Sequence, residues 1–115
     1  MPLFKLYLPM SLGHDQITII SKDLSNMVAQ TLGKPEKYVM IIIEQASIMM
    51  SGSNEPAAFA DVRSIGSINC KTAETLSDKL CKCLKNHLLI SPERVYSNFS
   101  DINADLWGWN EKTFG

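Results

Sequence analysis

Hydrophobic positions along the chain switch between two spacings, one typical of strands and one typical of helices. Residues 3–8 form an apolar stretch with the length of a strand. Over residues 15–32 the apolar side chains recur every three or four positions and share one face of a helix. Gly33 follows as a C-cap, and Pro35 prevents the helix from continuing. The chain is therefore predicted to begin with a strand and an amphipathic helix.

Two further stretches predict strands in the middle of the chain. Residues 38–44, YVMIIIE, are apolar on both alternations, which predicts a central strand covered on both faces. Turn-forming residues then occupy positions 51–56, with the sequence SGSNEP. Residues 57–68 predict a third strand, with small side chains on one alternation and mixed side chains on the other.

A second helix and a last strand complete the pattern. The helix is predicted over residues 72–87, with Thr72 as its N-cap and Glu74 favourable in its first turn. The last strand is predicted over residues 94–99, RVYSNF, and the aromatic segment beyond it is expected to be irregular. The apolar stripe of the helix consists of Leu76, Leu80, Cys83, Leu84 and Leu88.

The two halves of the chain echo each other. The segments KPEK, starting at Lys34, and SPER, starting at Ser91, each place a Pro-Glu pair followed by a basic residue at the same point between a helix and a strand. A duplicated βαβ unit with right-handed crossovers puts both helices on one face of a four-stranded mixed sheet. We therefore predict a single α/β (α+β) domain over residues 1–115. The other sheet face has no layer left to bury it, which predicts self-association in a closed symmetric ring.

Composition and charge exclude several functional classes. Eleven Lys and Arg residues against twelve Asp and Glu residues give a net charge of −1, which leaves no charge basis for binding nucleic acid or an anionic membrane surface. No apolar run approaches the ~20 residues that span a bilayer, so we expect no membrane insertion. The N-terminus lacks the pattern of a secretory signal. The cysteines, Cys70, Cys81 and Cys83, are interpreted as reduced thiols in a cytoplasmic protein.

Metal and nucleotide chemistry have little support in the sequence. GKP at residues 33–35 lacks the glycine spacing and the Ser or Thr of a phosphate loop. His14 and His87 are judged to have no carboxylate or cysteine partner at ligand spacing, so we assign them to a loop and a helix end. We therefore expect no metal site and no cofactor.

Short motifs spread over nearly the whole chain match a known family in order and spacing. Together they resemble the macrophage migration inhibitory factor family of the tautomerase superfamily. The resemblance implies a homotrimer in which the sheets of three chains line a barrel-like interior and the helices lie outside. The motifs are MP at the start, GKP with Tyr38 four residues after Lys34, SGSNEPAAF, SIG at residues 64–66, ISPERVYSNF at residues 90–99, and GWN followed by TF near the end.

The resemblance implies keto–enol tautomerisation of small aromatic substrates, phenylpyruvate-like and dopachrome-like compounds, with Pro2 as the base. Physical chemistry supports this choice independently. Proton transfer at a carbon next to a carbonyl needs a base whose pKa lies near the working pH. A free α-amino group has a pKa of ~7.7 to 8.0, and burial beside a lysine lowers it further. Pro2 offers such an amine only after Met1 is removed, because its nitrogen is otherwise an amide.

The resemblance also implies how the substrate is held. Lys34 would bind the substrate carboxylate, and the backbone N–H of Ile65 would donate to the same anion. Tyr96 and Asn98 lie two apart on the last predicted strand, so they share the sheet face away from the helices. In the resembling trimers, such residues close the pocket of the neighbouring subunit and contact the substrate.

Aromatic residues and two departures from the family pattern refine the prediction. Tyr38, Trp107 and Phe114 are expected to form aromatic walls of the pocket. Position 107 is a small aliphatic residue in vertebrate members, so the tryptophan here should narrow the pocket and alter substrate preference. Residues 57–60 are Ala-Ala-Phe-Ala where several members carry C-x-x-C, which excludes the thiol–disulfide activity proposed for those members.

A second class of function stays open. The chain is alternatively a secreted cytokine-like or host-modulating protein that binds a cell-surface receptor through the trimer exterior, with incidental tautomerase activity. Export would then use a route that does not depend on a signal peptide. Receptor binding should survive Pro2→Gly, whereas catalysis should not.

Overall fold

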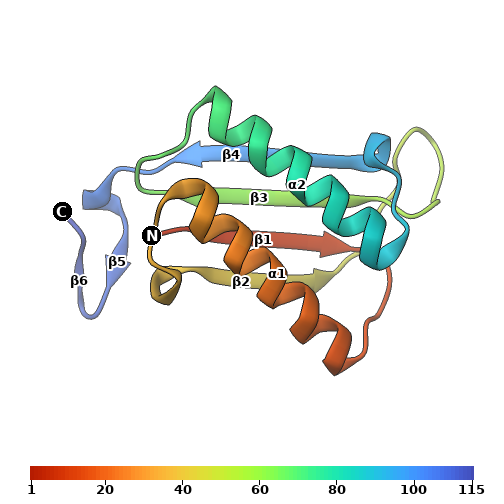
Figure 1. The fold of residues 1–115 in the computed structure, drawn as a ribbon, viewed down its shortest axis with the longest axis horizontal. Helices are drawn as coiled ribbons and strands as arrows, with labels where there is room; N and C mark the ends of the chain where they lie inside the picture. The colour runs from red at the N-terminus through yellow and green to blue at the C-terminus, as the bar shows by residue number, and fades with distance from the viewer.

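The computed structural model describes residues 1–115 as one four-stranded sheet with two long helices packed against it (Figure 1). The strand order is β2-β1-β3-β4. Strands β1 and β2 are parallel, as are β3 and β4, while β1 and β3 are antiparallel. The bounds are β1 Leu3–Leu8, α1 His14–Leu32, β2 Met40–Gln45, β3 Ala58–Ser64, α2 Cys70–Leu88 and β4 Val95–Asp101.

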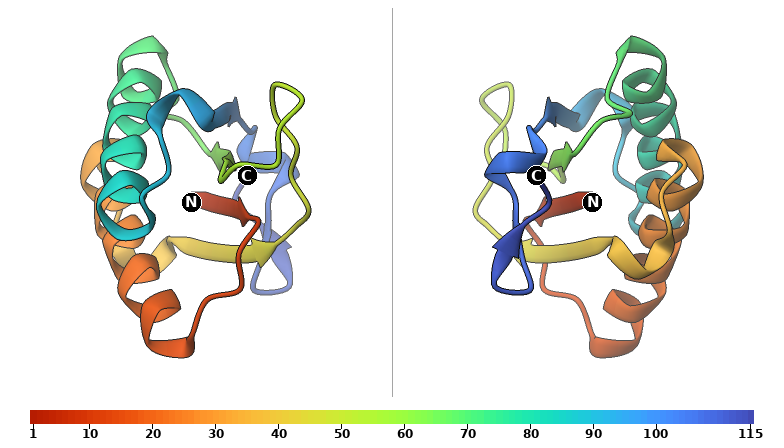
Figure 2. Two further views of the ribbon diagram at one scale, coloured as in Figure 1. Left: turned by 90° about the vertical axis from the view of Figure 1, so that its right-hand side faces the viewer. Right: turned by 90° about the vertical axis from the view of Figure 1, so that its left-hand side faces the viewer.

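This topology confirms the duplicated βαβ unit. Each parallel pair is joined through one long helix, and both helices cover the same face of the sheet (Figure 2). On β1, Phe4, Leu6 and Leu8 are buried beneath the helices, while the alternate residues are only half-buried. The opposite sheet face is covered by neither helix. The buried side chains of the two helices complete the core. They are Ile20, Leu24, Val28 and Leu32 of α1 and Leu76, Leu80 and Leu84 of α2.

The helix ends confirm one predicted cap and correct another. Gly33 ends α1 with a left-handed φ of 65°, as predicted. Helix α2 begins at Cys70, and its N-cap is Asn69 instead of Thr72. The Asn69 side chain accepts from the Thr72 N–H at 3.0 Å, and Thr72 Oγ1 accepts from the Asn69 N–H at 3.0 Å. Thr72 therefore supplies the reciprocal half of a capping box three residues inside the helix.

The prediction of a doubly covered central strand over residues 38–44 is wrong for the single chain. Strand β2 lies at the sheet edge, and Tyr38 belongs to the short 3-10 helix η1, Glu36–Tyr38. Ile41 and Ile43 pack on the core, whereas Met40 is 60% exposed on the alternate face. An apolar run specifies burial potential on both faces, but it does not specify which strand occupies the middle of a sheet.

The remaining boundaries follow from local backbone geometry. Strand β3 ends at Ser64, earlier than predicted, because Gly66 and Ser67 take positive φ values of 73° and 65° and turn the chain. Strand β4 begins one residue later than predicted, since Arg94 closes the 3-10 turn η2, Pro92–Arg94. The C-terminal segment, expected to be irregular, forms the short 3-10 turn η3, Ala104–Leu106, and a small hairpin of β5, Gly108–Trp109, and β6, Lys112–Thr113. No helix has the length and apolarity required to cross a membrane.

Candidate active site

A cavity of about 690 Å³ is lined by the N-terminal residues and by the C-terminal segment. The N-terminus and the C-terminal hairpin lie at the same end of the molecule (Figure 1). The size of the cavity falls within the ~300–1,000 Å³ typical of small-molecule sites. Most of its lining residues are hydrophobic. They come from residues 1–3, from residues 37–40 at the start of β2, from Arg63, and from the C-terminal segment between Ile102 and Phe114.

The N-terminal residues are held at this cavity by the sheet. Pro2 is buried, and its carbonyl accepts a hydrogen bond from the Met40 N–H at 3.0 Å. The Met1 amine has a pKa lowered from its ordinary value of 8.0, chiefly because burial removes water from the cation and secondly because Lys34 carries a like charge. An amine at this end of β1 is therefore biased toward its neutral, basic form.

Lys34 approaches the same region from the end of α1. Its charge reaches the N-terminal amine, and its Nζ lies 3.9 Å from the position that a Cβ on Gly66 would occupy. Lys34 therefore lies beside the loop that contains Ile65, although neither residue lines the cavity. The Gly66 N–H donates to Asp101 Oδ1 at 2.8 Å, which ties this loop to the end of β4.

Two cationic residues line the cavity itself, and sequence reasoning missed both. Lys37 Nζ lies 5.0 Å from the ring centroid of Tyr38. Arg63, on the open sheet face, binds Asp61 two residues earlier, with an Nη2–Oδ2 distance of 2.9 Å. Neither residue stands in a recognisable motif, so only the fold reveals their position.

An aromatic wall closes one side of the cavity. Tyr38, Trp107 and Phe114 all line it, at the positions predicted for aromatic walls. Trp109 was not predicted, yet it stacks on Phe114 with centroids 5.3 Å apart and meets Tyr38 edge-on at 6.1 Å. The WGWN sequence at residues 107–110 contained a usable signal, because extended backbone brings residues two apart, such as Trp107 and Trp109, to one side.

Tyr96 and Asn98 are not brought to this cavity within one chain. Tyr96 pairs with Phe59, which pairs with Tyr7, so Tyr96 lies level with a residue five positions from Pro2. At the rise of a strand this separation is about 17 Å. Both side chains are exposed, whereas Val95 and Phe99 pack on the core, so the predicted alternation of faces is confirmed.

One judgement about the histidines is wrong. His87 has both a carboxylate and a cysteine nearby: its Nε2 lies 2.6 Å from Asp23 Oδ2, and Cys83 lies one helical turn before it on α2. Burial raises the pKa of Cys83 to about 11, and the negative charge of Asp23 adds to the shift. The i, i+4 spacing of Cys83 and His87 was visible in the sequence, but Asp23 becomes a neighbour only through helix packing.

Comparison with known proteins agrees with the geometry. The family model for macrophage migration inhibitory factor (MIF) matches residues 1–115. The mouse macrophage migration inhibitory factor is 40% identical over 93 residues, covering 80% of this chain and 81% of the relative. The Xenopus laevis factor is 36% identical over 115 residues, covering 99% of each chain.

Solved structures extend the similarity to the fold. The macrophage migration inhibitory factor homologue from Prochlorococcus marinus has a TM-score of 0.91 and 34% identity, covering 98% of this chain and 99% of that one. The Trichinella spiralis factor has a TM-score of 0.86 and 31% identity, covering 96% and 98%. These similarities support a function of the MIF type, either cytokine-like or tautomerase. The chain belongs to the macrophage migration inhibitory factor family of the tautomerase superfamily.

Proposed function

We propose that the chain is a keto–enol tautomerase for phenylpyruvate-like and dopachrome-like compounds, with the Pro2 amine as its base once Met1 is removed. The observation that carries the proposal is the position of the N-terminal amine. In the chain that carries Met1, this amine is that of Met1, and it lies at a mostly apolar cavity where burial and Lys34 lower its pKa. Removal of Met1 would leave the amine of Pro2, a buried residue, in the same surroundings. A neutral amine near neutral pH is what proton abstraction from carbon requires.

The proton transfer needs no group other than this amine and water. The neutral nitrogen of Pro2 takes a proton from the carbon next to the substrate carbonyl, and the electrons of that C–H bond form the C=C bond of the enol. The carbonyl oxygen gains a proton from water as the C=O bond becomes a single bond, and the hydroxide left behind takes the proton from the amine, which restores the neutral base. In the opposite direction, the protonated amine returns its proton to carbon. Proline contributes a rigid secondary amine at the start of a strand, where its missing N–H costs little.

Substrate orientation comes from one anion site and one aromatic wall. Lys34 and the backbone N–H of Ile65 bind the substrate carboxylate, because both belong to the region beside the N-terminus. Tyr38, Trp107 and Phe114 hold the aromatic ring of the substrate in the cavity. The ring and the carboxylate then fix the reacting carbon relative to the Pro2 nitrogen.

We further propose that the working form is a homotrimer in which each site is shared between subunits. Support comes from the sheet face that lacks helices and from exposed side chains on it, including Met40 and Tyr96 at 60% and 66%. In this arrangement Tyr96 and Asn98 complete the cavity of a neighbouring copy. Burial of the open face would also explain why β2 is apolar on both alternations.

A cytokine-like function is the second candidate. It is favoured by the relatives, whose curated names are macrophage migration inhibitory factor. The chain would then bind a cell-surface receptor through its exterior, either from a cytoplasmic store or after export without a signal peptide. Binding of this kind does not require the Pro2 amine, so Pro2→Gly separates the two functions.

The test is an absorbance assay of phenylpyruvate tautomerisation on three forms of the protein. These forms have Met1 removed, Met1 retained, or Pro2→Gly with Met1 removed, and mass spectrometry verifies each N-terminus. We expect activity in the first form and a loss of about 10²- to 10⁴-fold in the other two, the usual contribution of a general base. The form that retains Met1 has an amide in place of the base, and Pro2→Gly has a flexible primary amine in place of the rigid secondary one. Equal rates from all three forms would overturn the proposed mechanism.

A further inference from the structure

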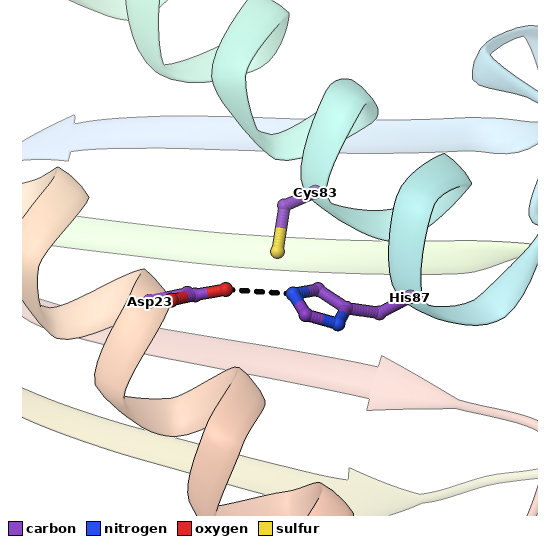
Figure 3. A group of neighbouring side chains, drawn as sticks. All are labelled: Asp23, Cys83 and His87. Atoms are coloured by element: carbon purple, nitrogen blue, oxygen red, sulfur yellow. Dashed lines mark hydrogen bonds and ion pairs between the residues drawn. The ribbon is translucent and has the colours of Figure 1, made fainter.

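A group of three potential metal ligands lies between the two long helices (Figure 3). Asp23 comes from α1, while Cys83 and His87 come from α2. The Asp23 carboxylate is bound to His87 Nε2 at 2.6 Å, and the Cys83 sulfur points toward this pair. One ligand atom from each residue lies within 4.8 Å of the others. None of the three residues lines the cavity at the N-terminus.

The fold holds these side chains in a defined arrangement. Cys83 and His87 are four residues apart on α2, so they share one helix face, and that face packs against α1. The same i, i+4 spacing places paired ligands on one helix in known zinc sites. Cys83 and His87 are half-buried, whereas Asp23 is exposed, so an ion has access from solvent while two ligands stay ordered.

The donor set matches a particular kind of ion. One sulfur, one imidazole nitrogen and one carboxylate oxygen suit a borderline-soft cation that accepts four tetrahedral ligands, which describes Zn²⁺. Ligand atoms around tetrahedral zinc lie about 3.5 Å from one another, given metal–ligand distances of about 2.0–2.3 Å. The three ligand atoms, which lie within 4.8 Å of one another, are already near this separation.

We propose that Asp23, Cys83 and His87 bind one Zn²⁺ ion per chain on the outer side of the helix layer. Water or an external ligand takes the fourth position, as in zinc sites that have three protein ligands. Binding displaces the Cys83 thiol proton to solvent, and the thiolate and carboxylate together balance the charge of the ion. The ion takes the place of the direct Asp23–His87 contact.

The first experiment titrates the reduced, chelator-treated full-length protein with Zn²⁺ by calorimetry and with Co²⁺ by absorbance. We expect one equivalent per chain, with a cobalt–thiolate charge-transfer band and the intense visible bands of tetrahedral cobalt. Zinc should also raise the unfolding temperature, because an ion that binds only the folded state stabilises it. Absence of stoichiometric binding would overturn the proposal and leave the Asp23–His87 contact as an ion pair only.

Matched variants then assign the ligands. Cys83→Ser should abolish the cobalt–thiolate band, and His87→Gln and Asp23→Asn should each weaken zinc binding by about 100-fold or more, since even outer partners of a ligand contribute 10- to 100-fold. Cys81→Ser is the control, because its sulfur lies near the Pro92 carbonyl and outside the cluster. A thiolate band that persists in Cys83→Ser, or disappears in Cys81→Ser, contradicts the assignment. Circular dichroism verifies that each variant is folded.

Discussion

Trp109 stacks on Phe114 with ring centroids 5.3 Å apart and ring planes 9° from parallel. This pair links strand β5 to the residue that follows strand β6, and it forms part of the cavity wall. The Phe114 N–H also donates to the Trp107 carbonyl at 3.1 Å, so the wall and the hairpin backbone are one unit. The shape of the proposed substrate site therefore depends on packing within the last few residues of the chain.

Trp109→Ala removes the stack on Phe114 and the edge-on contact with Tyr38. Aromatic pairs contribute about 0.5–1.5 kcal/mol beyond the area they bury, so we expect KM for phenylpyruvate to rise by roughly 3- to 10-fold. The kcat should fall less, because the Pro2 amine is untouched. Steady-state kinetics measure both constants, and Trp109→Phe is the control that keeps a ring in place. An unchanged KM in the alanine variant contradicts a role for this wall.

Trp107→Val tests whether this position sets selectivity. The indole narrows the cavity, so its replacement by a small side chain should raise kcat/KM for bulky dopachrome-like substrates relative to kcat/KM for phenylpyruvate. One extra or missing methylene group in an apolar pocket changes selectivity by about 10-fold or more. An indole is larger than a methylene, so the change at position 107 should be at least as great. The ratio of kcat/KM for the two substrates is the measurement. Identical ratios in the native and substituted proteins would show that position 107 has no such role.

Lys34→Ala should alter the pH dependence of catalysis in a defined direction. The charge of Lys34 helps to lower the pKa of the Met1 amine, and we expect the same effect on the Pro2 amine once Met1 is removed, so loss of Lys34 should raise the pKa of the base. The base is active when deprotonated, and the acid limb of kcat/KM should therefore move to higher pH. KM should rise as well, because the substrate carboxylate loses the positive charge of Lys34 that is proposed to bind it. Lys37→Ala is the control: it lines the cavity, but burial and Lys34 account for the shift of the amine.

The sharing of sites between subunits can be tested by mixing two inactive proteins. The form that retains Met1 lacks the base, because its Pro2 nitrogen is an amide, and Asn98→Ala lacks the residue contributed to the neighbour. In mixed trimers formed at equal ratio, about a quarter of the sites would combine a free Pro2 amine with a native Asn98 from the adjacent copy. We expect activity to return to that fraction after co-refolding, while light scattering confirms three chains per particle. No recovery, with trimers present, contradicts a shared site.

Asn69→Ala addresses stability instead of chemistry. It removes the side chain that accepts from the Thr72 N–H and leaves a donor of α2 without its cap. N-cap loss costs about 1 kcal/mol, which should lower Tm by roughly 4–8 °C in a domain of this size. Asn86→Ala, an exposed change in the last turn of the same helix, is the control and should leave Tm nearly unchanged. Thermal unfolding followed by circular dichroism distinguishes the two.

Local patterns predicted much of this fold because they depend on neighbours in sequence. The bounds of β1 were predicted as they occur, and Gly33 was identified as a cap, since strand length and left-handed backbone are encoded within a few residues. Thr72 was misassigned because Asn69, three residues earlier, is also a good N-cap residue, and Thr72 serves as its partner in the capping box. The edge position of β2 was missed because strand order depends on contacts between distant segments.

The residues of the candidate site also fall into those that local sequence reveals and those that only the fold reveals. Pro2, Lys34 and the aromatic residues stood out through motifs, and the fold brings them to one end of the molecule. Arg63 and Lys37 carry no local signal, and their place at the cavity depends on β-strand register and on the 3-10 turn. Asp23 and His87 meet only because two helices pack together across 64 residues of sequence.

The hydrogen bond from the Met40 N–H to the Pro2 carbonyl has a practical consequence for anyone who produces this protein. It fixes the direction in which the chain enters the sheet, so any residues fused ahead of Pro2 emerge directly into the cavity. An N-terminal affinity tag would then occupy the cavity and block the substrate. It would also convert the proposed base into an amide. A tag placed after Gly115 adds no residue ahead of Pro2. With an N-terminal tag, a protease that leaves Pro2 as the first residue should turn an inactive preparation into an active one.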